Sequence, residues 1–208
     1  DASFTEEAFI RRYNADLAND LGNLLNRVIS MIGKYCEGRL PTPPPSIFEK
    51  EGPAAELFEQ LKAVATGLQA DLEHFTLSQG ITRVIEAVRA TNRFLETQQP
   101  WAQARATDRG PLHATLYAAS EALRICAGLL YPLMPTKMTE LRAALGMENP
   151  MTVNPEELTQ PEGLEPGRPV AAPGALFPRI EAPLPEAPPA AAPRPAKSAP
   201  VPGTIGHP

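Results

Sequence analysis

Two polar side chains in the first forty residues, Asn23 and Arg27, have types and a spacing suited to binding a planar polar ligand. They are four residues apart, so on a helix they lie one turn apart on the same face. An amide beside a guanidinium offers several hydrogen-bond donors and an amide acceptor, which can pair with the edge of a nucleobase. The same spacing is also typical of a solvated polar face, and periodicity alone does not distinguish the two interpretations.

Trp101 is the single tryptophan of the chain, and it directly follows Pro100. An aromatic ring at such a rigid corner can act as a platform for a stacked base, an interaction worth about 1–3 kcal/mol. The ordinary alternative is a large aromatic side chain at the edge of the core. Asn92 falls on the apolar stripe of the preceding helix, and a buried amide needs partners. We therefore predict that Asn92 holds a polar network that supports Pro100 and Trp101, rather than contacting a ligand itself.

A long helix must position Asn23 and Arg27. Apolar residues recur at spacings of three and four over residues 17–35, and Ser3 or Thr5 can cap the start of this helix. Polar residues around Asn19 are poor helix formers, so a kink is predicted there. Gly22 then serves either close helix packing or the close approach of a ligand.

Four further helices are predicted from apolar spacing and from the positions of prolines. They run from Pro53 to about Phe75, from Ser78 or Gly80 to about Thr97, from Pro111 to Leu130, and from Pro135 to Leu145, where Gly146 ends the last one. The proline-rich stretch 40–46 is interpreted as a stiff connection between helices, the alternative being a ligand for proline-binding domains. The predicted fold class is all-α, a bundle of about five helices with an extended proline-rich tail.

The composition changes after residue 150, since 15 of the 25 prolines follow it. This change predicts a helical domain over residues 1–148 and an extended segment over residues 149–181 that docks back on the protein. Residues 182–208 are rich in Pro and Ala and have few large apolar groups, so disorder is predicted for them. Leu176 and Phe177 are the apolar residues expected to dock, either on the bundle or on another part of a longer protein.

The formal net charge is −5, and the stretch up to Pro150 has 15 Lys and Arg against 18 Asp and Glu. This balance argues against a non-specific DNA or RNA binder, whose affinity comes from neutralising phosphates. It is compatible with a small site that binds exposed bases by stacking and hydrogen bonding. The sequence has neither a recognisable signal peptide nor an apolar run long enough for a membrane helix.

The sequence carries no pattern for catalysis: it lacks a glycine-rich phosphate loop, a cluster of histidines and an activated nucleophile. Lys137-Met138-Thr139 superficially matches the start of a nucleotide-binding loop, but it enters an amphipathic helix and the second Lys is missing. Cys36 and Cys126 are far apart and have no clustered ligands near them. We expect two buried or half-buried thiols, with neither a metal site nor a disulfide.

The stretch Asn14-Ala-Asp-Leu-Ala-Asn-Asp-Leu-Gly-Asn-Leu-Leu-Asn-Arg27 resembles the opening helix of the anticodon-binding domain of bacterial methionyl-tRNA synthetase, a class I aminoacyl-tRNA synthetase. Further matches follow in the same order: NRFLETQQPW at residues 92–101, LYPLMP at 130–135 with a short helix ending in Leu145-Gly146, and LFPRIE at 176–181. Together these matches cover roughly residues 3–181. The family's catalytic signatures are absent, so the chain looks like the C-terminal part of such an enzyme.

The resemblance implies that Asn23, Arg27 and Trp101 bind the tRNA anticodon, with Asn92 and Pro100 in support. The leading cytosine of a CAU anticodon would stack on Trp101, while Asn23 and Arg27 would hydrogen-bond its Watson–Crick edge. The implied partners are methionine tRNA and the catalytic domain of the same enzyme, with no DNA and no membrane.

The activity implied for the parent protein is ATP-dependent joining of methionine to its tRNA in the cytoplasm. This chain alone would be inactive and would hold no cofactor, because ATP and any zinc would belong to the absent catalytic part. A monomer is expected. The alternative function is a non-catalytic helical adaptor whose proline-rich tail recruits partners. Wide separation of Asn23, Arg27 and Trp101 would favour the adaptor, and their exposure on one patch would favour tRNA binding.

Overall fold

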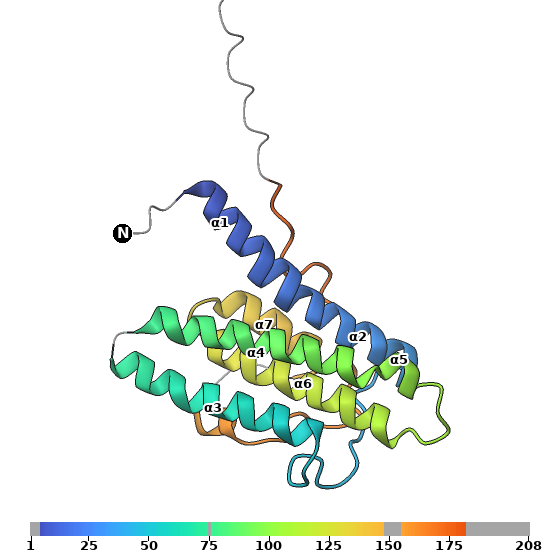
Figure 1. The fold of residues 1–208 in the computed structure, drawn as a ribbon. Helices are drawn as coiled ribbons and strands as arrows, with labels where there is room; N and C mark the ends of the chain where they lie inside the picture. Colours follow the sequence, from blue (N-terminus) through green and yellow to red (C-terminus); the bar gives the residue numbers. More distant parts are fainter. Residues whose placement is uncertain (1–4, 75, 148–154, 182–208) are drawn as a thin grey trace, which may run out of the picture.

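The computed structural model describes residues 5–74, 76–147 and 155–181, and helices dominate it (Figure 1). The helices are α1 (Glu6–Arg12), α2 (Asn23–Tyr35), α3 (Pro53–Glu73), α4 (Leu77–Gln98), α5 (Pro100–Gln103), α6 (Gly110–Leu130) and α7 (Pro135–Ala144). A π-helix over Tyr13–Gly22 joins α1 to α2, and a 3-10 turn spans Pro155–Thr159. Because α5 is a single turn and α1 continues into α2, five long helical segments remain. The predicted all-α bundle of about five helices is confirmed.

The first helix stays helical from Glu6 to Tyr35, and around Asn19, where a break or kink is predicted, it continues as a π-helix. Thr5 caps its start, since the Thr5 side-chain oxygen accepts a hydrogen bond from the Ala8 N–H at 3.2 Å. Gly22 ends the π-helix. A Cβ there would lie 3.2 Å from the Leu17 carbonyl oxygen and 3.8 Å from the Phe177 ring, so Gly22 serves close packing.

Helices α3, α4 and α6 pack side by side, and the α1–α2 helix crosses over α4 and α6 (Figure 1). Every residue of α6 from Thr115 to Leu130 is buried. The sequence predicts a single apolar stripe on this helix, and that prediction is incomplete because α6 is covered on all sides. Two of the buried residues, Glu121 and Arg124, are charged.

Tyr117 and Glu121 bind the backbone of the segment that follows residue 155. The Tyr117 hydroxyl donates to the Leu164 carbonyl at 2.7 Å, and the Glu121 carboxylate accepts from the Leu164 N–H at 2.6 Å. Burial raises the pKa of the Glu121 carboxyl above its ordinary value, and the Arg124 guanidinium opposes that rise. Burial likewise raises the pKa of Tyr117, so its hydroxyl remains a donor.

Arg124 completes this buried polar cluster. Its Nε lies 2.7 Å from Glu121 Oε2, and its two terminal nitrogens donate to the carbonyls of Glu157 at 3.1 Å and Gln160 at 2.7 Å. A Cβ at Gly163 would lie 2.5 Å from the Arg124 guanidinium carbon, so only glycine allows this close approach. The segment over residues 155–164 is therefore fastened to α6 by buried hydrogen bonds as well as by apolar packing.

The rest of the extended segment also packs on the bundle. Leu176 and Phe177, the apolar residues expected to dock, are buried in the same core as the helices. Leu40 and Gly167 pair through their backbones, with the Gly167 N–H donating to the Leu40 carbonyl at 2.8 Å. The Asn14 side chain bonds the backbone of Ile180 at 2.8 and 2.9 Å.

The division of the chain into a helical domain (1–148), an extended segment (149–181) and a tail (182–208) stays a prediction. The tail predicted to be disordered, residues 182–208, and the expected helix end at Phe75 lie outside the described residues. No helix in the three described stretches is both long and apolar enough to cross a membrane.

Cys36 is half-buried and Cys126 is buried, as predicted, and both are free thiols in the structure. Burial raises the pKa of both, that of Cys126 to about 12. Because the thiolate is the reactive species, we expect iodoacetamide at pH 8 to label Cys36 slowly in the native protein and Cys126 only after unfolding. Mass spectrometry of the labelled peptides measures this. Equal native labelling of both thiols would contradict the burial of Cys126.

Candidate nucleic-acid interface

Asn23 and Arg27 lie in the first two turns of α2, one turn apart as predicted. Asn23 is exposed, whereas the Arg27 side chain is 35% exposed and reaches α4. Its Nη1 donates to Asn92 Oδ1 at 3.3 Å and its Nη2 to Glu96 Oε1 at 2.5 Å. Two partners on adjacent turns of α4 therefore fix the plane of the guanidinium, which is the part of Arg27 that would bind a ligand.

Asn92 holds a polar network, but on the side of α4 that faces the first helix. Its amide nitrogen donates to the Asp20 carbonyl at 3.2 Å and to the Val88 carbonyl at 3.4 Å, while its oxygen accepts from Arg27. Asn92 is half-buried, so these bonds satisfy an amide that water reaches only in part. Asn92 thus orients Arg27.

Arg89 on α4 also stabilises the packing of the first helix against α4, through ion pairs with Asp16 and Asp20. Its Nη2 lies 2.7 Å from Asp16 Oδ1 and its Nε lies 2.7 Å from Asp20 Oδ2. The hydrogen bond with Asp20 raises the pKa of Arg89, so this arginine remains charged. The carboxylate of Asp16 is almost fully buried, and an unpaired charge there would be costly. The two ion pairs hold the π-helix, and with it the start of α2, against α4.

Sequence reasoning missed Glu96, Arg89 and Asp16. A signal was present, because Arg89, Asn92 and Glu96 follow one another at spacings of three and four on α4. That spacing indicates one polar face of a helix. It does not show that the face lies against another helix and not against solvent.

Trp101 lies just beyond these contacts, five residues after Glu96. Gln99 adopts a left-handed backbone conformation with φ 49°, which ends α4, and the buried Pro100 begins the single turn of α5. The Trp101 side chain is one of the exposed large hydrophobic groups, at 38%. A buried proline therefore anchors the corner while the ring next to it stays open to a partner, as a stacking platform requires.

In Figure 1, α5 lies at the end of α4. α4, the helix that ends just before Trp101, carries Asn92 and Glu96 in its last turns, and these two residues bind Arg27. The structure brings Arg27, Asn92 and the Pro100–Trp101 corner to the same end of the bundle, with Asn23 exposed one turn before Arg27.

A family model described as the anticodon binding domain of methionyl tRNA ligase matches residues 45–186. The chain belongs to this family. The matched range includes residues 155–164, the segment to which Tyr117, Glu121 and Arg124 of α6 are hydrogen-bonded. Membership supports anticodon binding over the helical adaptor.

Relatives of known sequence agree with this assignment. The methionine–tRNA ligase of Halalkalibacterium halodurans is 34% identical over 185 residues, a match that covers 87% of this chain and 27% of that protein. The methionine–tRNA ligase of Streptomyces coelicolor is 35% identical over 192 residues, covering 87% of this chain and 34% of that protein. The chain therefore spans about a third or less of the relatives it matches and corresponds to the anticodon-binding part of a ligase, without the catalytic domain.

Solved structures of methionyl-tRNA synthetases share the fold. The apo form from Mycobacterium tuberculosis superposes with a TM-score of 0.77 at 28% identity, covering 87% of this chain and 36% of that one. The same enzyme in complex with methionyl-adenylate gives a TM-score of 0.76 at 28% identity, covering 85% of this chain and 34% of that one.

Proposed function

We propose that this chain recognises the CAU anticodon of methionine tRNA as the anticodon-binding part of a methionine–tRNA ligase. The observation that carries the proposal is the fixed guanidinium of Arg27, held by Asn92 and Glu96 at the end of the helix that leads into the exposed ring of Trp101. A pre-positioned donor group beside an open aromatic ring suits a single flat, hydrogen-bonding ligand such as a splayed-out base.

The leading cytosine would stack on Trp101 and present its Watson–Crick edge to Arg27 and Asn23. Asn92 and Glu96 engage one N–H of each terminal nitrogen of Arg27, so other N–H groups remain for the O2 and N3 acceptors of cytosine. Uracil carries an N–H at position 3, which would face a donor and leave hydrogen bonds unmade. Unpaired polar groups in a site built for hydrogen bonding give strong rejection of the wrong ligand.

The wider activity belongs to the whole ligase, which would join methionine to its tRNA with ATP through a catalytic part outside this chain. ATP and any zinc would bind there. Among the described residues no three His, Cys, Asp or Glu side chains lie together as a metal ion requires. The proposal takes the ligase as a cytoplasmic monomer and this fragment as inactive alone. The acidic net charge of the chain suits a module that adds specificity to binding energy supplied elsewhere.

Replacing Arg27 with glutamine tests the assignment. We expect the Arg27→Gln chain to bind a CAU anticodon stem-loop about fivefold to more than a hundredfold more weakly, since a good bidentate pair contributes about 1–3 kcal/mol of discrimination. Binding to a UAU stem-loop should change little. Fluorescence anisotropy of labelled stem-loops measures both.

The matched control is Arg93→Gln, which removes an exposed arginine from α4. It should alter binding to the two stem-loops by the same small factor. If Arg27→Gln also weakens both stem-loops equally, Arg27 contacts phosphate and does not recognise the base.

A further inference from the structure

Asp20 takes part in two sets of polar contacts at once. Its carboxylate accepts a hydrogen bond from Arg89 Nε at 2.7 Å, and its backbone carbonyl accepts one from the Asn92 amide nitrogen at 3.2 Å. The Asn92 amide oxygen in turn accepts a hydrogen bond from Arg27 Nη1 at 3.3 Å. A continuous path of hydrogen bonds therefore leads from Arg89, through Asp20 and Asn92, to the guanidinium of Arg27.

This path fixes which end of the Asn92 amide faces Arg27. The amide nitrogen donates to two backbone carbonyls, those of Asp20 and Val88, and a carbonyl can only accept. The amide oxygen is thereby directed to Arg27, whose guanidinium can only donate. If the Asp20 carbonyl moved away, the amide could turn and present its own donors to Arg27, an arrangement that makes no hydrogen bond. The contact with Arg27 thus depends on where the Asp20 backbone lies.

Arg89 holds the Asp20 backbone in place. Asp20 belongs to the π-helix over Tyr13–Gly22, and Arg89 binds this helix at two points, since its Nη2 also lies 2.7 Å from Asp16 Oδ1. Segments of π-helix are rare and frequently occur at functional sites. A planar guanidinium that bridges two carboxylates fixes both of them relative to its own helix. The position of the π-helix on α4 is therefore set by the two ion pairs of Arg89.

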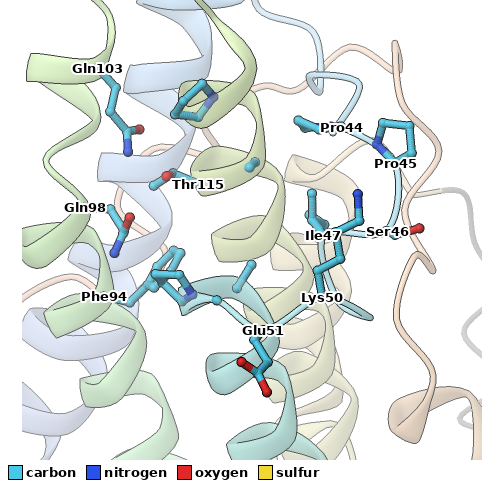
Figure 2. Close-up of a pocket in the computed structure, with 15 residues that line it drawn as sticks. Pro44, Pro45, Ser46, Ile47, Lys50, Glu51, Phe94, Gln98, Gln103 and Thr115 are labelled. Carbon is cyan, nitrogen blue, oxygen red and sulfur yellow. The ribbon is translucent and has the colours of Figure 1, made fainter.

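The residues of this path lie on one face of α4. Arg89, Asn92 and Glu96 follow one another at spacings of three and four residues. Phe94 and Gln98 lie on the opposite face, where they line a cavity of about 350 Å³ (Figure 2). A substitution at Arg89 can therefore act on Arg27 while the cavity side of α4 stays unchanged.

We propose that Arg89 is a positioning residue for anticodon recognition, which acts through Asp20 and Asn92 to hold Arg27 in the orientation that binds the first base. This role rests on the proposed function. Arg89 is itself bound to Asp16 and Asp20, so its effect reaches the base only through the Arg27 guanidinium.

The test measures the ratio of the affinities for the CAU and UAU stem-loops by fluorescence anisotropy. Arg89→Met removes the donors to Asp16 and Asp20, and it should lower this ratio about threefold to tenfold, within the range that substitutions along such networks produce. Arg89→Lys keeps the charge but has a single donor nitrogen in place of the planar fork, so it should restore the ratio only in part. Circular dichroism at the titration temperature confirms that each variant is folded.

Arg83→Met is the matched control. Arg83 and Asp71 form a similar ion pair on α4, in which the arginine side chain is 41% exposed and the aspartate 9%, against 42% and 8% for Arg89 and Asp16. Urea unfolding should show a similar loss of stability in the two methionine variants, whereas Arg83→Met should keep the wild-type affinity ratio. An equal fall of the ratio in both variants would show that Arg89 acts through general stability and would overturn the proposed role.

A double-mutant cycle tests whether the effect passes through Arg27. In the Arg27→Gln chain, Arg89→Met should change the affinity ratio no further, because the group that Arg89 positions is already absent. A further fall of the same size in that background would contradict the route through Arg27. If wild-type chain prefers the CAU stem-loop and Arg89→Met prefers it equally, only the role of Arg89 has failed. If wild-type chain binds both stem-loops equally, the proposed function has failed with it.

Discussion

Replacement of Trp101 with alanine is expected to abolish discrimination between a CAU anticodon stem-loop and one with a changed first base. Stacking on an aromatic side chain contributes about 1–3 kcal/mol per base, so its loss weakens CAU binding by about fivefold to more than a hundredfold. The ring also orients the base toward Arg27, and without it the hydrogen bonds to the Watson–Crick edge lose their geometry. Anisotropy titrations of both stem-loops give the discrimination ratio directly.

The fold should survive this change. The Trp101 side chain is 38% exposed, and Pro100, which anchors the corner, is retained. Because more than half of the ring is buried, we expect the free energy of unfolding to fall by about 1–2 kcal/mol, which leaves the domain folded. Trp101→Phe is the matched control, because it keeps an aromatic ring and should keep part of the discrimination. Discrimination near the wild-type ratio in the alanine variant would refute the role of Trp101, and a large loss of stability would show that the ring belongs to the core.

Replacement of Arg124 with methionine is expected to lower the free energy of unfolding by about 3–5 kcal/mol, the usual effect of breaking a buried ion pair. The substitution leaves the Glu121 carboxylate, which is 1% exposed, without its countercharge. It also removes the donors to the Glu157 and Gln160 carbonyls, so the segment over residues 155–164 loses its attachment to α6. Urea unfolding followed by circular dichroism measures the change.

Two further variants isolate the cause. Lys137→Met breaks a surface pair with Glu140 and should lower stability by no more than about 1 kcal/mol. Adding Glu121→Gln to Arg124→Met removes the stranded charge while keeping an acceptor for the Leu164 N–H, so the double variant should be more stable than the single one. A double variant that is less stable than Arg124→Met would show that the buried charge is not the reason for the loss.

Local sequence signals predicted the helix boundaries well. Pro53 and Pro135 each begin a helix as expected, and Gly146 has the positive φ of 79° that suits a residue directly after a helix end. These signals act within one turn of the chain, so they do not depend on how the helices later pack.

The environment of α6 could not be predicted in this way. Glu121 and Arg124 are of the type and spacing typical of a solvated face. They are buried because a segment some forty residues later in the sequence covers them, and no local pattern specifies that contact. The apolar stripe predicted for this helix is therefore buried as expected, but the opposite face of the helix is buried as well.

In the candidate site, too, local sequence signals predicted some residues, while contacts between distant parts of the chain could not be predicted. The spacing of Asn23 and Arg27 placed them on one helical face, the position of Trp101 after Pro100 indicated a possible stacking platform, and the resemblance to a known family linked the three residues. The partners that fix the guanidinium, Asn92 and Glu96, are 65 and 69 residues from Arg27 in the sequence. Contacts over such distances depend on the packing of α2 against α4, and so does the exposure of the Trp101 ring.

Trp101 is the only tryptophan, so its fluorescence reports on the proposed stacking site alone. The most direct measurement is a titration of the chain with a CAU anticodon stem-loop and, separately, with a UAU stem-loop at the same salt concentration. Stacking of the cytosine predicts quenching by the CAU stem-loop and a much weaker response to the UAU stem-loop. Equal quenching by both, lost in parallel as salt is raised, would contradict base recognition and indicate association driven by charge.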